Sequence, residues 1–336
     1  MSARLLLRRL VFLVFVILGL SLITFLLSHV VPTDPVRLFA GPRASAATLV
    51  QLRHQLGFDR PLLQQYLTYA GGLLHGDFGY SLASHRAVSA DLYDFLPATL
   101  ELTAVAVVLV LLVGVPLGVI SAVWRGSPLD WLSRAVSITG VSFPAYWLAL
   151  LAQFLFFAKL GWLPEGGRLD PTTTPPHHVT GLFLVDSLLQ GSPALFWQSL
   201  SHLLLPSAVL GYGSLAVLTR MVRSSMLEAL VQDYVRTARA KGLVARRVVL
   251  RHALRNALLP ATTVMGLQIG YLLGGAVLVE DVFSWPGVGR YATLATESLD
   301  YNAIMAVTLV AALIYVVTNL AVDLLYATLD PKLSYG

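Results

Sequence analysis

The sequence contains no cysteine, and only 12% of its 336 residues are Asp, Glu, Lys or Arg. The absence of cysteine excludes disulfide and thiolate chemistry. The few charges go with 56% hydrophobic residues and a mean hydropathy of +0.73. The apolar residues lie in long blocks instead of alternating with polar positions. This composition indicates a membrane protein.

The chain also lacks the common nucleotide-binding and hydrolytic motifs. It has three lysines, Lys159, Lys241 and Lys332, and none of them follows a glycine, so no G-x-x-x-x-G-K-[ST] phosphate loop exists. No apolar stretch holds paired aspartates or an H-E-x-x-H zinc motif. The adjacent His177 and His178 point apart on most backbones. We therefore expect a chain that is not an enzyme, with no catalytic residue, metal site or cofactor of its own.

Six stretches without Asp, Glu, Lys or Arg approach or exceed the ~20 residues that a helix needs to cross a bilayer. They cover residues 10–31, 102–123, 135–158, 203–219, 257–279 and 303–322. The sequence therefore predicts an all-α fold, a single polytopic membrane domain over 1–336 with six transmembrane helices. A seventh apolar segment, 181–200, is interrupted by Asp186 and Pro193, and we expect it to lie at the membrane interface.

The distribution of charge predicts the orientation. With six spans both termini lie on one side, together with the loops at 124–134 and 220–256. That side carries 15 of the 23 Arg and Lys residues. Because Arg and Lys are retained on the cytoplasmic face during insertion, we expect both termini in the cytoplasm and the loop 32–101 outside. The net charge of +5 then reflects orientation and gives no reason to expect nucleic-acid binding.

Carriers driven by an ion gradient usually need ionisable groups near the middle of the bilayer. Here Glu101 and Asp323 fall at the ends of predicted spans, and the deep polar residues are neutral. Gln153, Gln268 and Asn319 are candidates to line a path, although hydrogen bonds between helices are the commoner use of such residues. If the chain moves a solute uphill, another subunit must therefore hydrolyse the nucleotide.

The loop 220–256 carries nine Arg and Lys residues against two acids, Glu228 and Asp233. Asp233 is suited to cap a short helix at 234–241, and Gly242 is suited to the left-handed position that ends it. The pattern predicts a short, sharply terminated helix between two membrane spans.

A second helix is predicted to place Arg247, Arg251 and Arg255 at positions i, i+4 and i+8. Like charges at this spacing repel by roughly a few tenths of a kcal/mol per pair. The face therefore needs an anion beside it, and either lipid headgroups or an acidic protein groove would serve.

The motif "EDVFSWPGVGR", from Glu280 to Arg290, follows the fifth span. Phe283 and Trp285 suit a membrane interface, and Pro286 with Gly287 favours a turn. The residues fit two interpretations equally well, an interfacial or re-entrant turn and a lid over a central path.

Several motifs in order resemble the dipeptide/oligopeptide family of ABC-importer permeases. "YVRTARAKGL" followed by "RHALRNALLP" is similar to that family's cytoplasmic loop, and "HGDFGYS", "LPATLEL", "FSWPGVGR" and "DLLYATLDPKL" occur in the matching order. The importer loop is generally written E-A-A, three residues, G. Here Gly242 matches the glycine, Thr237 and Ala238 match the small residues, and Arg236 stands at the acidic position.

The resemblance implies a type I importer permease whose loop inserts into an ATPase subunit. The implied coupling residues are Tyr234, Arg236, Thr237, Ala238, Arg239, Ala240, Lys241, Gly242, Arg247 and Arg251. Phe283, Trp285, Pro286, Gly287 and Arg290 are the candidate outer gate.

The implied partners are a homologous second permease forming a heterodimer, two ABC ATPase subunits, a periplasmic substrate-binding protein and membrane lipid, in the bacterial inner membrane. The implied cargo is a dipeptide or short oligopeptide. Nickel, haem and delta-aminolevulinate are alternatives within the family, and a membrane-embedded scaffold or enzyme is the alternative of another class.

Overall fold

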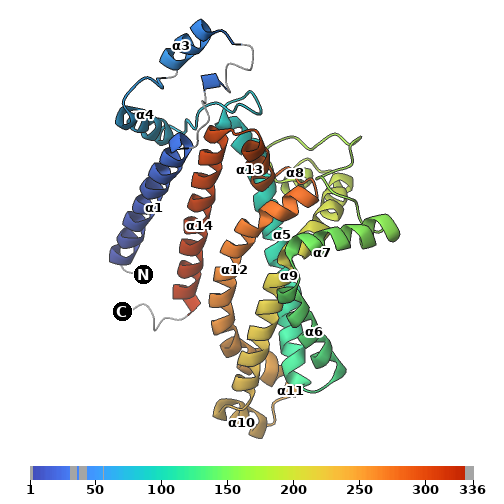
Figure 1. Ribbon diagram of the computed structural model, residues 1–336. Helices are drawn as coiled ribbons and strands as arrows, with labels where there is room; N and C mark the ends of the chain where they lie inside the picture. The colour runs from blue at the N-terminus through green and yellow to red at the C-terminus, as the bar shows by residue number, and fades with distance from the viewer. Residues whose placement is uncertain (1–2, 31–35, 38–43, 56, 330–336) are drawn as a thin grey trace.

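The computed structural model describes residues 3–30, 36–37, 44–55 and 57–329 (Figure 1). These residues are helical or lie in turns, with one isolated antiparallel bridge between Tyr80 and Ala87. Five helices are long and apolar enough to cross a membrane, and the number reaches six when one bent pair of helices counts as a span. The prediction of an all-α membrane protein is confirmed, and the predicted third span is the bent pair.

Three long helices form the core: α5 (Val88–Val123), α9 (Pro193–Leu230) and α12 (Leu254–Val282). Helix α9 packs against both of the others. Small residues such as Ala106 and Ala216, both fully buried, let the backbones approach closely. The bundle is thus held by close packing, the main source of helix association in a bilayer.

Two further spans form an outer layer. Helix α1 (Ala3–Val30) packs on α14 (Tyr301–Leu329), and α14 packs on α12. The two helices lie side by side in Figure 1, drawn in blue and red. Phe12 and Phe15 of α1 are 64% and 70% exposed, as expected for a surface that contacts lipid tails.

The third predicted span, 135–158, is not one straight helix. Helix α6 (Pro128–Ser142) and the segment Ala145–Lys159 meet at an angle of 114°. This segment consists of α7 (Ala145–Ala152) and the π-helix η1 (Gln153–Lys159). The bend follows from Pro144, because a residue before proline is disfavoured in helical conformation, and Phe143 is indeed extended with φ −95° and ψ 136°.

The segment 181–200 does not form one interfacial element. Its first half is the short helix α8 (Phe183–Leu189), and its second half is the beginning of α9, which starts at Pro193. Proline is well tolerated in the first turn of a helix, so Pro193 starts α9 instead of breaking a segment. The fourth span is therefore much longer than its uncharged stretch at 203–219.

The two ends of the bundle are built differently. At one end, which we call the α10 end, lies the short helix α10 (Asp233–Ala240) beside α11 (Ala245–Arg247) and the π-helix η2 (Val248–Ala253). At the opposite end, the α13 end, lie α4 (Leu62–Leu74) and α13 (Val288–Glu297), with α3 (Ala46–Gln55) beyond them (Figure 1). Because helix Ala245–Val282 is continuous, the connection between spans four and five is shorter than the predicted loop 220–256.

Candidate coupling loop and outer gate

Helix α10 presents two distinct faces. Val235 and Ala238, three residues apart, are 0% and 6% exposed and belong to the main hydrophobic core. The other residues of the predicted coupling helix are exposed: Tyr234, Arg236, Thr237, Arg239, Ala240 and Lys241. Ala238 therefore holds α10 against its own bundle, and the polar face is the one available to a partner.

Gly242 ends α10 in the predicted left-handed conformation, with φ +72°. Its N–H donates to the Arg239 carbonyl (2.9 Å), and the Leu243 N–H donates to the Ala238 carbonyl (3.4 Å). This pair of bonds is the Schellman arrangement, which fixes the direction in which the chain leaves a helix. The predicted cap at the other end is wrong: Gln232 is the N-cap residue, and Asp233 is the first helical residue, 3.5 Å from Arg236.

The predicted arginine face is also modified. Arg247 ends α11, whereas Arg251 lies in η2 and Arg255 in α12. A π-helix closes its turn with i→i+5 hydrogen bonds, so four residues no longer make one α-helical turn there. All three arginines are exposed.

A buried carboxylate fixes the neighbouring helices at this end. Asp130 of α6 is 0% exposed and accepts hydrogen bonds from Ser121 (2.5 Å), the Gly126 N–H (2.9 Å), Arg223 Nε (2.8 Å) and Arg134 Nη2 (2.8 Å). These contacts join α5, α6 and α9. Sequence reasoning missed the site, although an acid surrounded by arginines between two apolar stretches was a usable signal.

Two exposed tryptophans, one on α6 and one on α9, lie near opposite ends of the α9 axis. Trp131, beside Asp130, is 64% exposed and has the Arg134 guanidinium 4.6 Å from its ring centre, whereas Trp197 near the start of α9 is 65% exposed. At 1.5 Å per residue, Arg223 lies about 39 Å along α9 from Trp197. This matches the ~40–45 Å of a bilayer with its headgroups, whose two interfaces are enriched in Trp.

At the α13 end, the motif after the fifth span is organised by Glu280. The predicted fifth span ends at residue 279, but α12 continues to Val282 and the Glu280 side chain is fully buried. Thr99 of α5 donates to Glu280 Oε1 (2.6 Å) and accepts from the Val288 N–H (2.8 Å). The Arg290 N–H donates to Glu280 Oε2 (3.0 Å). The carboxylate therefore takes up amide groups at the start of α13.

The close approach of Glu280 explains two glycines of the motif. A Cβ atom on Gly287 would lie 2.3 Å from Glu280 Oε1, and one on Gly289 would lie 2.6 Å from the Cα atom of Val277 and 2.8 Å from Glu280 Oε2. The carboxylate therefore fills the space at Gly287, whereas the α12 backbone and the carboxylate fill it together at Gly289.

The aromatic residues of the motif do not face a membrane interface. Phe283 and Trp285 are both 0% exposed. The indole N–H of Trp285 donates to the Ala98 carbonyl (2.9 Å), and the Gly167 N–H donates to the Phe283 carbonyl (2.9 Å). The interfacial placement of these rings is corrected: the segment is a packed corner between α5, α12 and the loop before α8.

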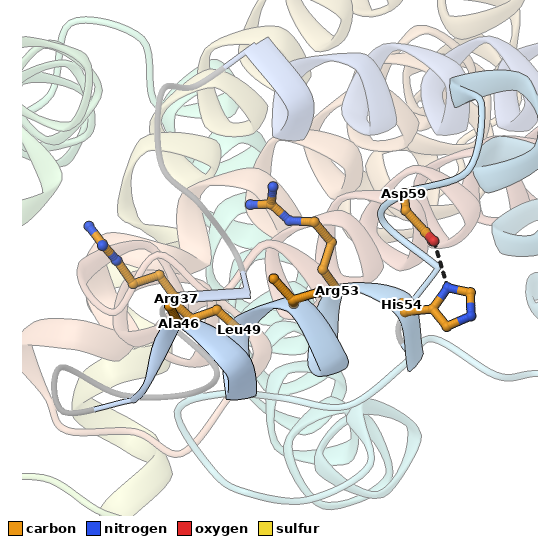
Figure 2. Close-up of a pocket in the computed structure, with 7 residues that line it drawn as sticks. Arg37, Ala46, Leu49, Arg53, His54 and Asp59 are labelled. Carbon is orange, nitrogen blue, oxygen red and sulfur yellow. Dashed lines mark hydrogen bonds and ion pairs between the residues drawn. The ribbon is translucent and has the colours of Figure 1, made fainter.

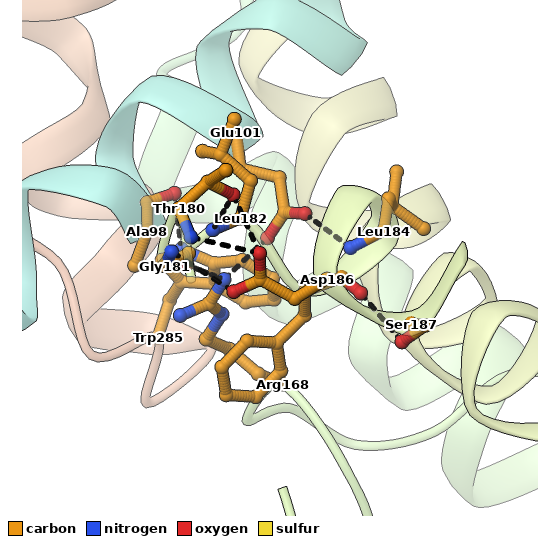
Figure 3. Close-up of polar contacts among 11 residues, drawn as sticks. Ala98, Glu101, Arg168, Thr180, Gly181, Leu182, Leu184, Asp186, Ser187 and Trp285 are labelled. Carbon is orange, nitrogen blue, oxygen red and sulfur yellow. Dashed lines mark hydrogen bonds and ion pairs between the residues drawn. The ribbon is translucent and has the colours of Figure 1, made fainter. Parts of the chain in front are cut away.

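A buried ion pair lies next to this corner (Figure 3). Arg168 and Glu101 are 8% and 4% exposed, and Arg168 Nη2 lies 2.6 Å from Glu101 Oε2. The guanidinium also donates to the Gly181 carbonyl (2.8 Å) and stacks 3.4 Å from the centre of the Phe183 ring. Burial lowers the pKa of Arg168, and the Glu101 carboxylate opposes that shift. The pair attaches the loop before α8 to α5.

Asp186 closes the same loop from the other side. Burial raises its pKa, but hydrogen bonds outweigh that effect and leave the pKa below its usual value. The donors are the Thr180 hydroxyl (2.7 Å) and the N–H groups of Thr180 and Gly181 (2.9 Å each). Asp186 is therefore a structural anchor, and its position in the sequence had suggested only an interruption of an apolar run.

Comparison with known proteins identifies the family. Residues 114–335 match the family described as "Binding-protein-dependent transport system inner membrane component", and residues 2–103 match its N-terminal membrane component. The chain belongs to this family. Its membership confirms a multi-pass, non-catalytic permease subunit that works with a binding protein in a transport complex, and it rules against the scaffold or enzyme alternative.

Three relatives are similar to this chain over nearly its whole length. The probable D,D-dipeptide transport system permease protein DdpB of Escherichia coli K12 is 49% identical over 96% of this chain and 95% of its own. The dipeptide transport system permease protein DppB of Alkalihalophilus pseudofirmus is 43% identical over 98% of both chains. The glutathione transport system permease protein GsiC of Salmonella typhimurium LT2 is 41% identical, again over 98% of both.

The three candidate pathway residues of the permease do not form one cluster. Gln153 donates to the Glu165 carbonyl (2.8 Å) at the α13 end, so it holds a loop. Gln268 of α12 accepts from Ser214 of α9 (2.8 Å), a bond between two helices. Asn319 is half-buried on α14. A lining role for these residues stays a prediction.

A cavity of about 490 Å³ lies far from the bundle, beside α3. Figure 2 shows Arg37 and Arg53 along one side and His54 at the far end, where its Nδ1 lies 2.6 Å from Asp59 Oδ2. No cluster of three or more metal-ligating side chains occurs among the residues that the structure describes.

Proposed function

We propose that the permease carries dipeptides or short peptides across the bacterial inner membrane, with both termini in the cytoplasm. The relatives named for dipeptides, D,D-dipeptides and glutathione support this class of cargo. The 15 basic residues on the side that holds both termini support the orientation. The complex then contains a second, homologous permease, two ATPase subunits and a periplasmic binding protein.

We propose further that an ATPase subunit binds the exposed face of α10 and moves this helix. The support for this is the position of α10 along the bundle relative to the exposed tryptophans, which are typical of membrane interfaces. Arg223 lies at the level of the Trp131 interface, and α9 continues for about 10 Å beyond it before α10 begins. This takes α10 past the headgroups, which add only ~5–7 Å to each side of the hydrocarbon core.

The arginines after α10 lie at different distances beyond the level of Arg223. The bond between Ser214 and Gln268 places these residues at one level. Counted from that level along the two helices, Arg255 lies about 6 Å farther out than Arg223, and Arg247 farther still. Arg255 is thus within reach of lipid headgroups, whereas Arg247 and Arg251 lie where an acidic protein groove would meet them.

The segment from Phe283 to Arg290 is proposed as the outer gate, in a closed state. Its support is the absence of exposed aromatic surface at Phe283 and Trp285 together with the bonds to α5 and the Gly167 loop. An interfacial turn would expose these rings to lipid. A gate of this kind opens by movement of a packed corner as a body, not by a flexible lid.

The test of coupling is Gly242→Val in the full complex. A valine in a left-handed conformation costs roughly 1–2 kcal/mol, so the chain leaves α10 in a different direction. We expect uptake of a labelled dipeptide to fall at least tenfold, with weaker co-purification of the ATPase subunits or ATP hydrolysis without transport.

Gly191→Val is the matched control. Gly191 has φ +69° and, like Gly242, nothing within 4 Å of an added Cβ, but it lies between α8 and α9 at the α13 end. Equal losses in the two variants, or parent-like uptake by Gly242→Val, would remove α10 from the coupling role. The cargo is tested separately by mass spectrometry of ligand released from the partner binding protein, where nickel, haem or delta-aminolevulinate would contradict peptide transport.

A further inference from the structure

Glu280 is the only fully buried carboxylate that the structure describes within α12. Its carboxylate oxygens accept hydrogen bonds from the Thr99 hydroxyl and from the Arg290 N–H. The Thr99 hydroxyl in turn accepts a hydrogen bond from the Val288 N–H. The side chain thus joins three elements, its own helix α12, the first turn of α13, and α5 through Thr99.

The helix that carries Glu280 also reaches the coupling loop. Residues Ala245–Val282 form one continuous helix, whose first turns contact α10 through η2. Figure 1 shows α12 running from the region of α10 and α11 to the base of α13. A displacement of α10 therefore has a continuous helical path to the residue that holds the gate, although this path contains the π-helix η2 and Pro260.

We propose that Glu280 is the positioning residue that makes the outer gate follow α12. When α12 moves, the carboxylate carries the start of α13 with it and releases or restores the contact with Thr99. Without this link α12 moves while Phe283 to Arg290 stay packed, and ATP is hydrolysed without transport. The inference rests on the proposed coupling through α10 and adds the residue by which that movement reaches the gate.

The experiment measures cargo molecules transported per ATP hydrolysed by the assembled complex in liposomes, with the binding protein present. For Thr99→Val we expect this ratio to fall at least fivefold while assembly and ATP hydrolysis stay within about twofold of the parent, because valine keeps the shape of threonine but loses both hydrogen bonds. The ratio is informative because a merely structural defect lowers assembly and both activities together.

The matched control is Thr103→Val, one turn along the same helix. Thr103 is as buried as Thr99, 5% against 6% exposed, but its hydroxyl has no hydrogen-bond partner among the residues that the structure describes. We expect a parent-like ratio. A parent-like ratio for Thr99→Val as well, or equal losses in both variants, would overturn the proposal.

Glu280 itself is tested against its neighbour. Glu280→Gln keeps the size of the side chain but turns an amide toward donors, so the ratio should fall at least tenfold, whereas Asp281→Ala, an exposed acid one residue away, should leave it unchanged. Gly287→Ala should lower assembly of the complex, and adding Glu280→Ala should relieve that assembly defect without restoring the ratio, because the clash at 2.3 Å needs the carboxylate. Glu280→Gln with a parent-like ratio contradicts the inference.

The outcome separates this inference from the coupling proposal. If Gly242→Val transports normally while Thr99→Val and Glu280→Gln are uncoupled, the role of α10 is wrong and the link at the gate stands. If Gly242→Val fails and the two gate variants transport normally, only the link is wrong.

Discussion

The charges beside the proposed outer gate and those that follow α10 lie in opposite environments. At the α13 end Glu101, Arg168 and Glu280 are each less than 10% exposed and are bonded to other elements of the same chain. At the α10 end Arg247 and Arg251 are exposed on short helical segments. Buried charges need partners within the molecule, whereas exposed charges are free to meet another one. The charges beside the gate are bonded within the chain, whereas the exposed arginines after α10 are accessible to another molecule.

The largest expected effect comes from breaking the buried pair. Arg168→Met leaves Glu101 as an unpaired buried carboxylate, and removing one partner of a buried pair costs about 3–5 kcal/mol. We expect a large drop in Tm of the detergent-solubilised permease and poor assembly.

The double variant Arg168→Met with Glu101→Leu should recover much of that loss, because no charge is then left buried without a partner. Asp94→Asn is the surface control: Asp94 pairs with Arg86 (2.9 Å) at the same end, but the two side chains are 44% and 51% exposed, so Tm should not change measurably. A small effect of Arg168→Met would mean that water reaches this end of the molecule.

A smaller effect is expected for the charge cluster at the α10 end. Asp130→Ala removes the acceptor shared by Arg223 and Arg134, whose side chains are 21% and 42% exposed. Both arginines can be solvated in the variant. The free energy of unfolding should therefore fall by about 1–3 kcal/mol, the cost of leaving the buried donors around Asp130 unpaired. The measurement is again Tm.

Asp233→Ala provides the control at this end, since Asp233 is 96% exposed and its contact with Arg236 spans 3.5 Å. We expect no change in Tm. If Asp130→Ala were as damaging as Arg168→Met, the contrast between the two ends would disappear.

The smallest effect on the folded permease is expected for Arg247→Ala and Arg251→Ala. Both side chains are exposed, so Tm should stay at the parent value. If these residues face an acidic ATPase groove, the variants should weaken ATPase binding modestly and reduce its dependence on salt. Unchanged ATPase binding combined with weaker binding to anionic vesicles would assign the two arginines to lipid.

Local patterns predicted much of this protein. Uncharged stretches located the spans, and Gly242 has the left-handed conformation that the sequence predicted for the end of α10. Other expectations were wrong because local patterns were all that the sequence offered. The bend before Pro144 was not predicted. Asp186 and Glu280 were expected in interfacial or loop segments, because the hydrogen bonds that bury them are not evident from the sequence.

The sequence by itself determined the class of protein, the position of the straight spans and the short helix with its glycine stop. These features depend on neighbours within a turn or on the average polarity of a stretch. Only the tertiary structure decided which charges are buried and what they hold, since Thr99 and Glu280 are 181 positions apart and Glu101 and Arg168 are 67 apart. No periodicity connects such residues, because their contact is set by how the helices pack. The glycines at 287 and 289 are likewise explained only by the packing, since the Glu280 carboxylate occupies the space beside Gly287 and the α12 backbone at Val277 lies against Gly289.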